Sequence, residues 1–110
     1  MITPTIKRGS AELAILALLT EEPLHGYAIA RRIEKQSGGL LRFTLASLYP
    51  LLYRMENRGW VRGRWQTLPS GRERRCYELT PKGRKQMAPM RKEWSLFFNA
   101  LHKLAGVGRA

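Results

Sequence analysis

Two neighbouring stretches of the sequence alternate in character, and they constrain the fold more than any other part of the chain. Residues 60–67 read WVRGRWQT, residues 72–79 read RERRCYEL, and the segment between them is LPSG. A period of two, aromatic side chains and a proline–glycine loop are typical of a β-hairpin. The sequence therefore predicts a two-stranded hairpin whose sides and tip carry arginine, namely Arg62, Arg64, Arg72 and Arg74.

The first segment expected to be helical, residues 8–23, is apolar on nearly every side. It reads RGSAELAILALLTEEP, with Ser10 as the expected N-cap and Pro23 at its end. A helix that is hydrophobic all round must be covered on every side. The core of the chain covers one face, and we infer that a second subunit covers another, with Leu16 in that contact.

Two further helices are expected before the hairpin. Residues 24–39 end at Gly38 and Gly39, which readily adopt the left-handed conformation of a helix terminus. Residues 44–59 place apolar side chains three or four positions apart, which predicts a buried stripe of Leu45, Leu48, Leu52 and Met55. The opposite side of that helix holds Ala46, Pro50, Tyr53 and Asn57.

The last expected helix, residues 79–104, carries a heptad pattern. Thr80 is its expected N-cap, and Pro81 stands where the first turn tolerates proline. An apolar residue recurs every three or four positions, as in helices that pair along their length. Pro89 interrupts this segment and is expected to kink it. We assign dimerisation here to Met87, Met90, Trp94, Phe97, Phe98, Leu101 and Leu104.

These elements together predict a mostly helical α+β fold, the winged helix-turn-helix. Residues 1–80 would form three helices and a two-stranded wing that bind DNA, and residues 81–110 a C-terminal dimerisation helix with its tail. The third helix would enter the major groove, which admits an α-helix, and the hairpin would lie beside it. The predicted DNA contacts are Thr44, Ser47, Tyr49, Pro50, Tyr53, Arg54, Arg62, Arg64, Arg72 and Arg74.

Several of these residues have a second interpretation. Thr44 is the N-cap of the third helix, a phosphate ligand, or both. Tyr49 could belong to the core, Tyr53 could pack on the wing, and Arg54 could be merely solvated. Pro50 is expected to shape the helix start that presents the residues before it to DNA. The hairpin arginines are expected to contact phosphates rather than to read bases.

The charge balance favours a polyanionic partner. The chain has 20 lysines and arginines against 8 acidic residues, all of them glutamate, and a net charge of +12. Such a field attracts DNA, RNA or an anionic membrane surface. Lys7 and Arg8 could add contacts to the DNA backbone. The apolar run at residues 13–19 is too short to span a bilayer, so we expect no membrane partner.

Neither catalysis nor a cofactor is expected. The single cysteine, Cys76, excludes an internal disulfide and fits a reducing, cytoplasmic setting. His25 and His102 have no partner at metal-ligand spacing, so no metal site is predicted. The chain contains no aspartate and no paired carboxylates in a plausible cleft, which speaks against an enzyme.

Three longer stretches resemble one family of regulators. They are ILALLTEEPLHGYAI at residues 15–29, SLYPLLYRMENRGWV at 47–61 and RERRCYELTPKGRKQM at 72–87. In this order and spacing, the chain resembles the PadR family of transcriptional regulators, in the branch with a single C-terminal dimerisation helix. The resemblance implies a homodimer that binds a palindromic operator, usually as a repressor, and that releases DNA when a small aromatic or cationic compound binds.

The chain departs from the family pattern in two places. One is Pro89 inside the last helix, which is expected to alter the geometry of the dimer helix. The other precedes Leu-Tyr-Pro, where the family usually has Gly-Thr and this chain has Ala46 and Ser47. Ser47 retains a hydroxyl for DNA, whereas Ala46 could alter how closely the backbone approaches, so the operator could differ. Trp94 and Phe97 are either dimer core or the lining of a cavity for a flat aromatic effector.

Two other functions compete with that of an operator-binding regulator. A non-specific nucleoid-type or RNA-binding protein could use the same basic face, and the ratio of specific to non-specific affinity distinguishes the two. The other is a partner-binding module that has lost DNA binding. The arginines of the third helix and hairpin favour DNA binding over that module.

Overall fold

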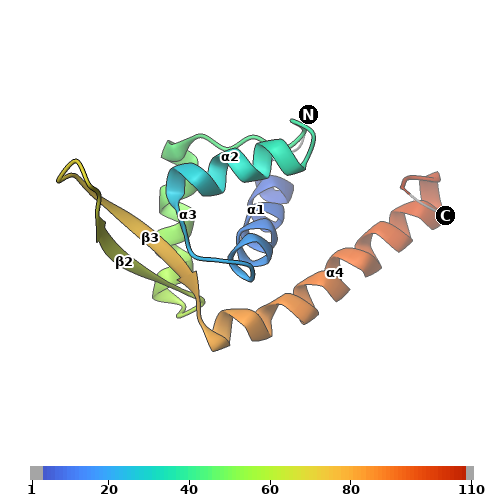
Figure 1. Cartoon of the computed structure of the whole chain (residues 1–110). Coiled ribbons are helices and arrows are strands. Elements are labelled where there is room, and N and C mark those ends of the chain that lie inside the picture. The colour runs from blue at the N-terminus through green and yellow to red at the C-terminus, as the bar shows by residue number, and fades with distance from the viewer. Residues whose placement is uncertain (1–3, 109–110) are drawn as a thin grey trace.

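The computed structural model describes residues 4–108, and the side chains from Gly9 onward. The fold is mostly helical α+β, as expected: three helices, a hairpin wing and a long C-terminal helix. In chain order the elements are α1 (Pro4–Leu19), β1 (Leu24–His25), α2 (Gly26–Gln36), α3 (Leu45–Asn57), β2 (Val61–Thr67), β3 (Glu73–Leu79) and α4 (Pro81–Ala105). The hairpin and α4 extend to opposite sides of the body formed by α1, α2 and α3 (Figure 1).

One hydrophobic core joins the three N-terminal helices to the base of the wing. Most of its members come from α1, α2 and α3, and each of β1, β2, β3 and α4 adds one buried side chain, so apolar residues of all these elements meet in one place. Burying such side chains is the main favourable contribution to folding. The largest fully buried side chains are Ile15, Leu16, Ile29, Leu48, Leu52, Met55 and Val61.

The structure corrects two expectations for α1. The helix begins at Pro4 and not after Ser10, so Ser10 lies inside it and is not its N-cap. The extra turns lie along α4, where the Trp94 ring reaches within 3.3 Å of the position that a β-carbon on Gly9 would take. The assignment of Leu16 to a dimer contact is wrong, because the core of a single chain already buries it completely.

The short strand β1 was not expected, because two residues show no alternation. It adds a third strand to the sheet, in the order β1-β3-β2. Leu24 pairs with Tyr77 and His25 with Cys76. The His25 Nδ1 atom also accepts a hydrogen bond from the Ala28 amide at 3.3 Å, so His25 caps α2. Burial, and then the charge of Arg74, lower the pKa of His25 from its ordinary value of 6.5.

The helix α4 starts as the sequence predicts. The Thr80 hydroxyl accepts a hydrogen bond from the Gly83 amide at 3.0 Å, and Pro81 occupies the first turn. The helix continues through Pro89 as one element and ends at Gly106, whose φ of +67° is left-handed. Among residues 4–108, no helix has the length and apolar character needed to cross a bilayer.

Candidate nucleic-acid interface

A pair of hydroxyl groups fixes the start of α3. The Thr44 Oγ1 atom accepts a hydrogen bond from the Ser47 amide at 3.2 Å, which is the N-cap arrangement predicted for Thr44. The Ser47 Oγ atom donates to the Thr44 carbonyl at 3.0 Å. Both side chains remain exposed to solvent, so α3 presents them at its N-terminus, where a helix favours anions.

The burial pattern of α3 separates a core face from an exposed face. Leu51 joins Leu48, Leu52 and Met55 in the core, whereas Leu45 is 37% exposed, so the buried stripe is shifted from the predicted one. The first turn projects beyond the core and leaves Leu45 partly uncovered. The exposed face carries Ala46, Ser47, Tyr49, Pro50, Tyr53, Arg54 and Asn57.

Pro50 lies on this exposed face of α3 and not in the core. A proline inside a helix clashes with the carbonyl four residues earlier, which is that of Ala46. That carbonyl belongs to the first turn of α3, so the disturbance stays at the exposed start of the helix. The buried residues are undisturbed, which explains how α3 tolerates Pro50.

Tyr49 links the exposed face of α3 to the start of α2. A β-carbon on Gly26 would lie 2.7–2.8 Å from the ring and hydroxyl of Tyr49, so the phenol packs directly on the glycine backbone. The Tyr49 residue is nevertheless 42% exposed. It therefore braces α2 against α3 and still offers part of its ring to solvent.

A groove of about 540 Å³ separates α3 from the wing. Its lining residues are Tyr49, Tyr53, Glu56, Asn57, Arg75 and Tyr77. Burial raises the pKa of the Tyr77 phenol above its ordinary value of 10, against an opposing effect of the Arg75 charge. The groove thus combines aromatic rings, an amide and one ion pair beside the exposed face of α3.

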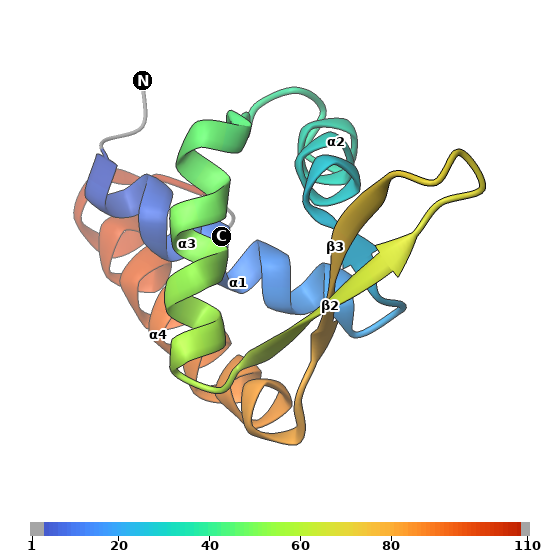
Figure 2. The same ribbon diagram turned by 90° about the vertical axis from the view of Figure 1, so that its left-hand side faces the viewer.

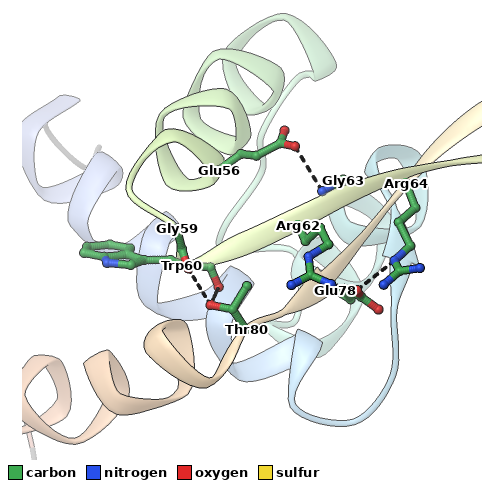
Figure 3. A network of polar contacts seen from close by, with 8 residues as sticks. All are labelled: Glu56, Gly59, Trp60, Arg62, Gly63, Arg64, Glu78 and Thr80. Atoms are coloured by element: carbon green, nitrogen blue, oxygen red, sulfur yellow. Dashed lines mark hydrogen bonds and ion pairs between the residues drawn. The ribbon is translucent and has the colours of Figure 1, made fainter.

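Glu56 makes that ion pair and binds both strands of the hairpin. Its Oε2 atom accepts a hydrogen bond from the Gly63 amide at 3.1 Å and another from Arg75 Nη2 at 2.7 Å. Figure 3 shows the contact from Glu56 on α3 to Gly63 on β2. The Arg75 guanidinium also lies over the Trp65 ring, 5.4 Å from its centroid.

The arginines predicted to contact DNA lie on the other face of the hairpin. Alternation puts Arg62, Arg64 and Arg74 opposite to Arg75, whose face also carries the buried Tyr77. Figure 3 shows Arg62 and Arg64 directed to Glu78. The Arg64 Nε atom donates to Glu78 Oε1 at 2.8 Å, and Arg62 Nη1 is 3.7 Å from the same atom.

The two remaining hairpin arginines, Arg74 and Arg72, differ in their surroundings. Arg74 Nε donates to Gln66 Oε1 at 3.0 Å, and Arg72 is exposed at the tip. The structure therefore brings the predicted α3 residues onto one face but does not bring Arg62, Arg64 and Arg74 beside them. The side chains of Lys7 and Arg8 lie outside the described residues.

Sequence reasoning missed the roles of Glu56, Trp65 and Arg75. The period of two already puts Trp65 and Arg75 on one face of the hairpin, and that signal was available. The contact with Glu56 depends on the angle between α3 and the wing, which no local pattern contains.

The aromatic residues assigned to dimerisation gather on α4. The Trp94 ring stacks on Phe98 with centroids 5.6 Å apart and meets Phe97 edge-on at 5.8 Å. Phe97, Phe98 and Leu104 are exposed in the single chain. Met87 is buried in the core of its own chain, so its assignment to a dimer contact is wrong, as it is for Leu16. In the part of the chain described, no cluster of histidine, cysteine and glutamate could hold a metal ion.

Residues 15–89 match the model of the transcriptional regulator PadR-like family. The chain belongs to this family. PadR-family proteins are transcriptional regulators and not enzymes. The match covers the end of α1, then α2, α3, the wing and the start of α4, so the motifs that suggested the family all lie inside it.

The PadR assignment agrees with the relatives of this chain. It is 36% identical over 76 residues to the probable transcriptional regulator Rv1176c of Mycobacterium tuberculosis, across 68% of this chain. The chain spans only 40% of the length of that relative.

Solved structures show the same PadR fold. A transcriptional regulator from Clostridium thermocellum, Cth-833, has a TM-score of 0.85 and 27% identity, covering 96% of this chain and 99% of its own. Bacillus subtilis PadR in complex with operator DNA has a TM-score of 0.65 and 26% identity, covering 71% of this chain and 44% of its own.

Proposed function

We propose that this PadR-family chain acts in the cytoplasm as a homodimeric repressor that binds an inverted-repeat operator. The observation that carries the proposal is the exposed face of α3, capped by Thr44 and presenting Ser47 and Tyr49 in a chain of net charge +12. An α-helix of this kind fits the major groove. The solved complex of Bacillus subtilis PadR with operator DNA supports the same role here.

The predicted dimer helix, α4 and the tail to residue 110, supports the two-fold symmetry of the proposal. Phe97, Phe98 and Leu104 form an apolar face that one chain leaves uncovered. A symmetric partner would cover it, since self-association is the commonest way that a helix with a heptad pattern buries such a face. The operator would then have half-sites about one helical turn apart.

A flat aromatic effector is the second part of the proposal. Stacked and edge-on rings at Trp94, Phe97 and Phe98 are the kind of lining that planar ligands favour. Tryptophan emission followed during titration with a panel of planar compounds tests this part. A ligand that changes both emission and operator affinity would support it, and a panel with no such ligand would contradict it.

Selection of bound fragments from the genomic DNA of the host tests the operator itself. We expect one enriched palindrome, and the sequence upstream of the gene for this protein is the first place to look for it. At fixed salt, a specific site should bind at least about a thousandfold more tightly than random DNA. Equal affinity for all fragments would instead favour the non-specific nucleic-acid-binding protein.

Transcription measured with the operator placed in a promoter tests repression. We expect less transcript when the protein is added and recovery when the palindrome is scrambled. An increase in transcript would identify an activator, and the repressor part of the proposal would then be wrong.

A further inference from the structure

We propose that Glu56 is a positioning residue for DNA recognition, because it holds the wing at one angle to α3. The inference rests on the proposed function, since it concerns the fit of the protein to its operator. Glu56 lies near the end of α3, and one of its carboxylate oxygens binds both β2 and β3. The relevant partner is one operator half-site, which α3 and the wing of one subunit must contact together.

The bond from Glu56 to β2 fills a position that the sheet leaves open. The strand order β1-β3-β2 makes β2 an edge strand, so its outward amides have no neighbouring strand to bind. The Gly63 amide donates instead to Glu56 at 3.1 Å. This bond ties the edge of the wing to α3 only a few residues beyond the turn that connects them.

The bond from Glu56 to β3 depends on Arg75 and on the absence of a side chain at Gly63. A β-carbon on Gly63 would come within 3 Å of the Arg75 guanidinium, so the guanidinium lies directly over the glycine. The Trp65 ring lies on the same cation, 5.4 Å from centroid to Cζ. Both bonds have the Glu56 carboxylate as acceptor, but in the Arg75 contact the donor is charged as well and the distance is shorter, 2.7 Å against 3.1 Å, so it is the stronger tie.

A second tie at the base of the wing makes the first one effective. The Thr80 hydroxyl donates to the carbonyls of both Gly59 and Trp60, in the turn between α3 and β2 (Figure 3). The pairing of β1 with β3 and the burial of Val61 and Tyr77 also attach the hairpin to the body. Glu56 adds a fixed point at Gly63 on the free edge of β2, and so restricts the angle of that edge to α3.

Because Glu56 is charged, a positioning role and a purely electrostatic role predict opposite changes in DNA affinity when it is replaced. Replacing Glu56 by a neutral residue raises the net charge by one. Electrostatics alone would then strengthen binding to every DNA sequence, because a carboxylate that repels phosphates is removed. A positioning role predicts the opposite sign for the operator, since a wing whose edge strand is held less firmly fits one half-site less well.

The test compares operator and random DNA for three variants of the full chain at one salt concentration. Glu56→Ala removes both ties to the wing. Glu73→Ala is the matched control, because Glu73 is an exposed glutamate on the same hairpin. Gly63→Ala leaves the charge unchanged but displaces Arg75, so it tests the same clamp by a steric route.

We expect the ratio of operator to random-DNA affinity to fall about tenfold in Glu56→Ala and in Gly63→Ala. It should change less than about twofold in Glu73→Ala. Hydrogen exchange of the Gly63 amide should become faster in Glu56→Ala, with the circular dichroism spectrum unchanged. If Glu56→Ala does not fold, Gly63→Ala carries the test alone.

Two results would overturn different statements. If the ratio of operator to random-DNA affinity in Glu56→Ala or Gly63→Ala equals that of the control, the positioning role is wrong and the operator proposal is unaffected. If the wild-type chain binds operator and random DNA with equal affinity, the operator proposal itself is wrong, whatever the variants show.

Discussion

The phenol of Tyr49 on α3 rests on the backbone of Gly26 on α2, so the two helices are in direct contact there. Only glycine allows this approach, because a β-carbon there would come within 2.8 Å of the ring. The contact gives Tyr49 a structural role that is separate from any contact with DNA. The two roles can be separated by the choice of substitution.

Tyr49→Phe should keep the stability of the protein and lower its affinity for the operator. The ring still packs on Gly26, and the only group lost is the hydroxyl, which lies beside Gly26 at the rim of that contact. Tyr49→Ala should cost about 2 kcal/mol of unfolding free energy as well, because a half-buried ring is removed. Urea unfolding and operator binding of both variants check this. Unchanged operator affinity in Tyr49→Phe would show that Tyr49 is only a brace.

Thr44→Asp should preserve α3 and weaken its binding to DNA. Aspartate caps a helix as well as threonine does, so the unfolding free energy should change by less than about 0.5 kcal/mol, whereas Thr44→Ala should lose about 1 kcal/mol. The added negative charge faces the phosphates in the proposed complex. Normal operator affinity in Thr44→Asp would place the start of α3 away from DNA.

Stability should fall in mild acid because of His25. Its pKa in the folded protein is below the ordinary value of 6.5, so folding disfavours the protonated ring. The contribution of neutral His25 to the free energy of unfolding is complete above pH 6.5. It declines as the pH falls from there through the pKa of the folded protein, and below that pKa the unfolding free energy no longer changes on account of His25. Thermal unfolding at pH 7.5 and pH 5 should show a lower midpoint at pH 5.

The matched variant for this effect is His25→Asn. Asparagine caps helices at any pH in this range, so the variant should show a smaller decrease between pH 7.5 and pH 5. An equal decrease in both proteins would assign the acid effect to other groups.

Arg72 should contribute more than Arg64 to the salt dependence of binding. Arg72 is exposed at the tip of the wing, whereas Arg64 donates to Glu78 at 2.8 Å and must leave that carboxylate to reach a phosphate. Arg72→Ala should therefore reduce the slope of log affinity against log salt by about one unit, and Arg64→Ala by clearly less. Operator titrations at four salt concentrations measure both slopes. Equal reductions would contradict the ranking.

Leu101→Glu should separate the proposed dimer and abolish operator binding. Leu101 lies on the heptad face of α4, where a charge would be buried without a partner. Asn99→Glu is the control, because Asn99 is exposed and lies almost opposite to that face. Sedimentation should show a monomer only for Leu101→Glu. An intact dimer in that variant would refute the heptad argument.

Elements with a strong local pattern could be predicted, and contacts between elements could not. The hairpin, the cap at Thr44 and the start of α4 each follow from a few adjacent residues, and the structure agrees with them. The strand β1 has only two residues and forms because β3 is beside it. A local pattern cannot contain such a partner.

The errors at Leu16 and Ser10 have a similar origin. The apolar character of α1 predicted that its whole surface is covered, but not that its own chain would cover Leu16. The turns of α1 that precede Ser10 carry few apolar residues, so no pattern predicted them. They start the helix at Pro4, beside α4. At the candidate site, the exposed face of α3 could be predicted and the clamp of Glu56 could not, since Glu56 and Arg75 are 19 residues apart.

The hydroxyl of Thr80 joins the turn after α3, the base of the wing and the start of α4 at one corner. It donates to the Gly59 and Trp60 carbonyls and accepts from the Gly83 amide, and Gly83 itself lies directly against the Trp60 carbonyl. In Figure 2, α3, β2 and α4 diverge from this corner. Because these bonds fix the start of α4 to the turn after α3, a rotation of the start of α4 would move the end of α3 with it.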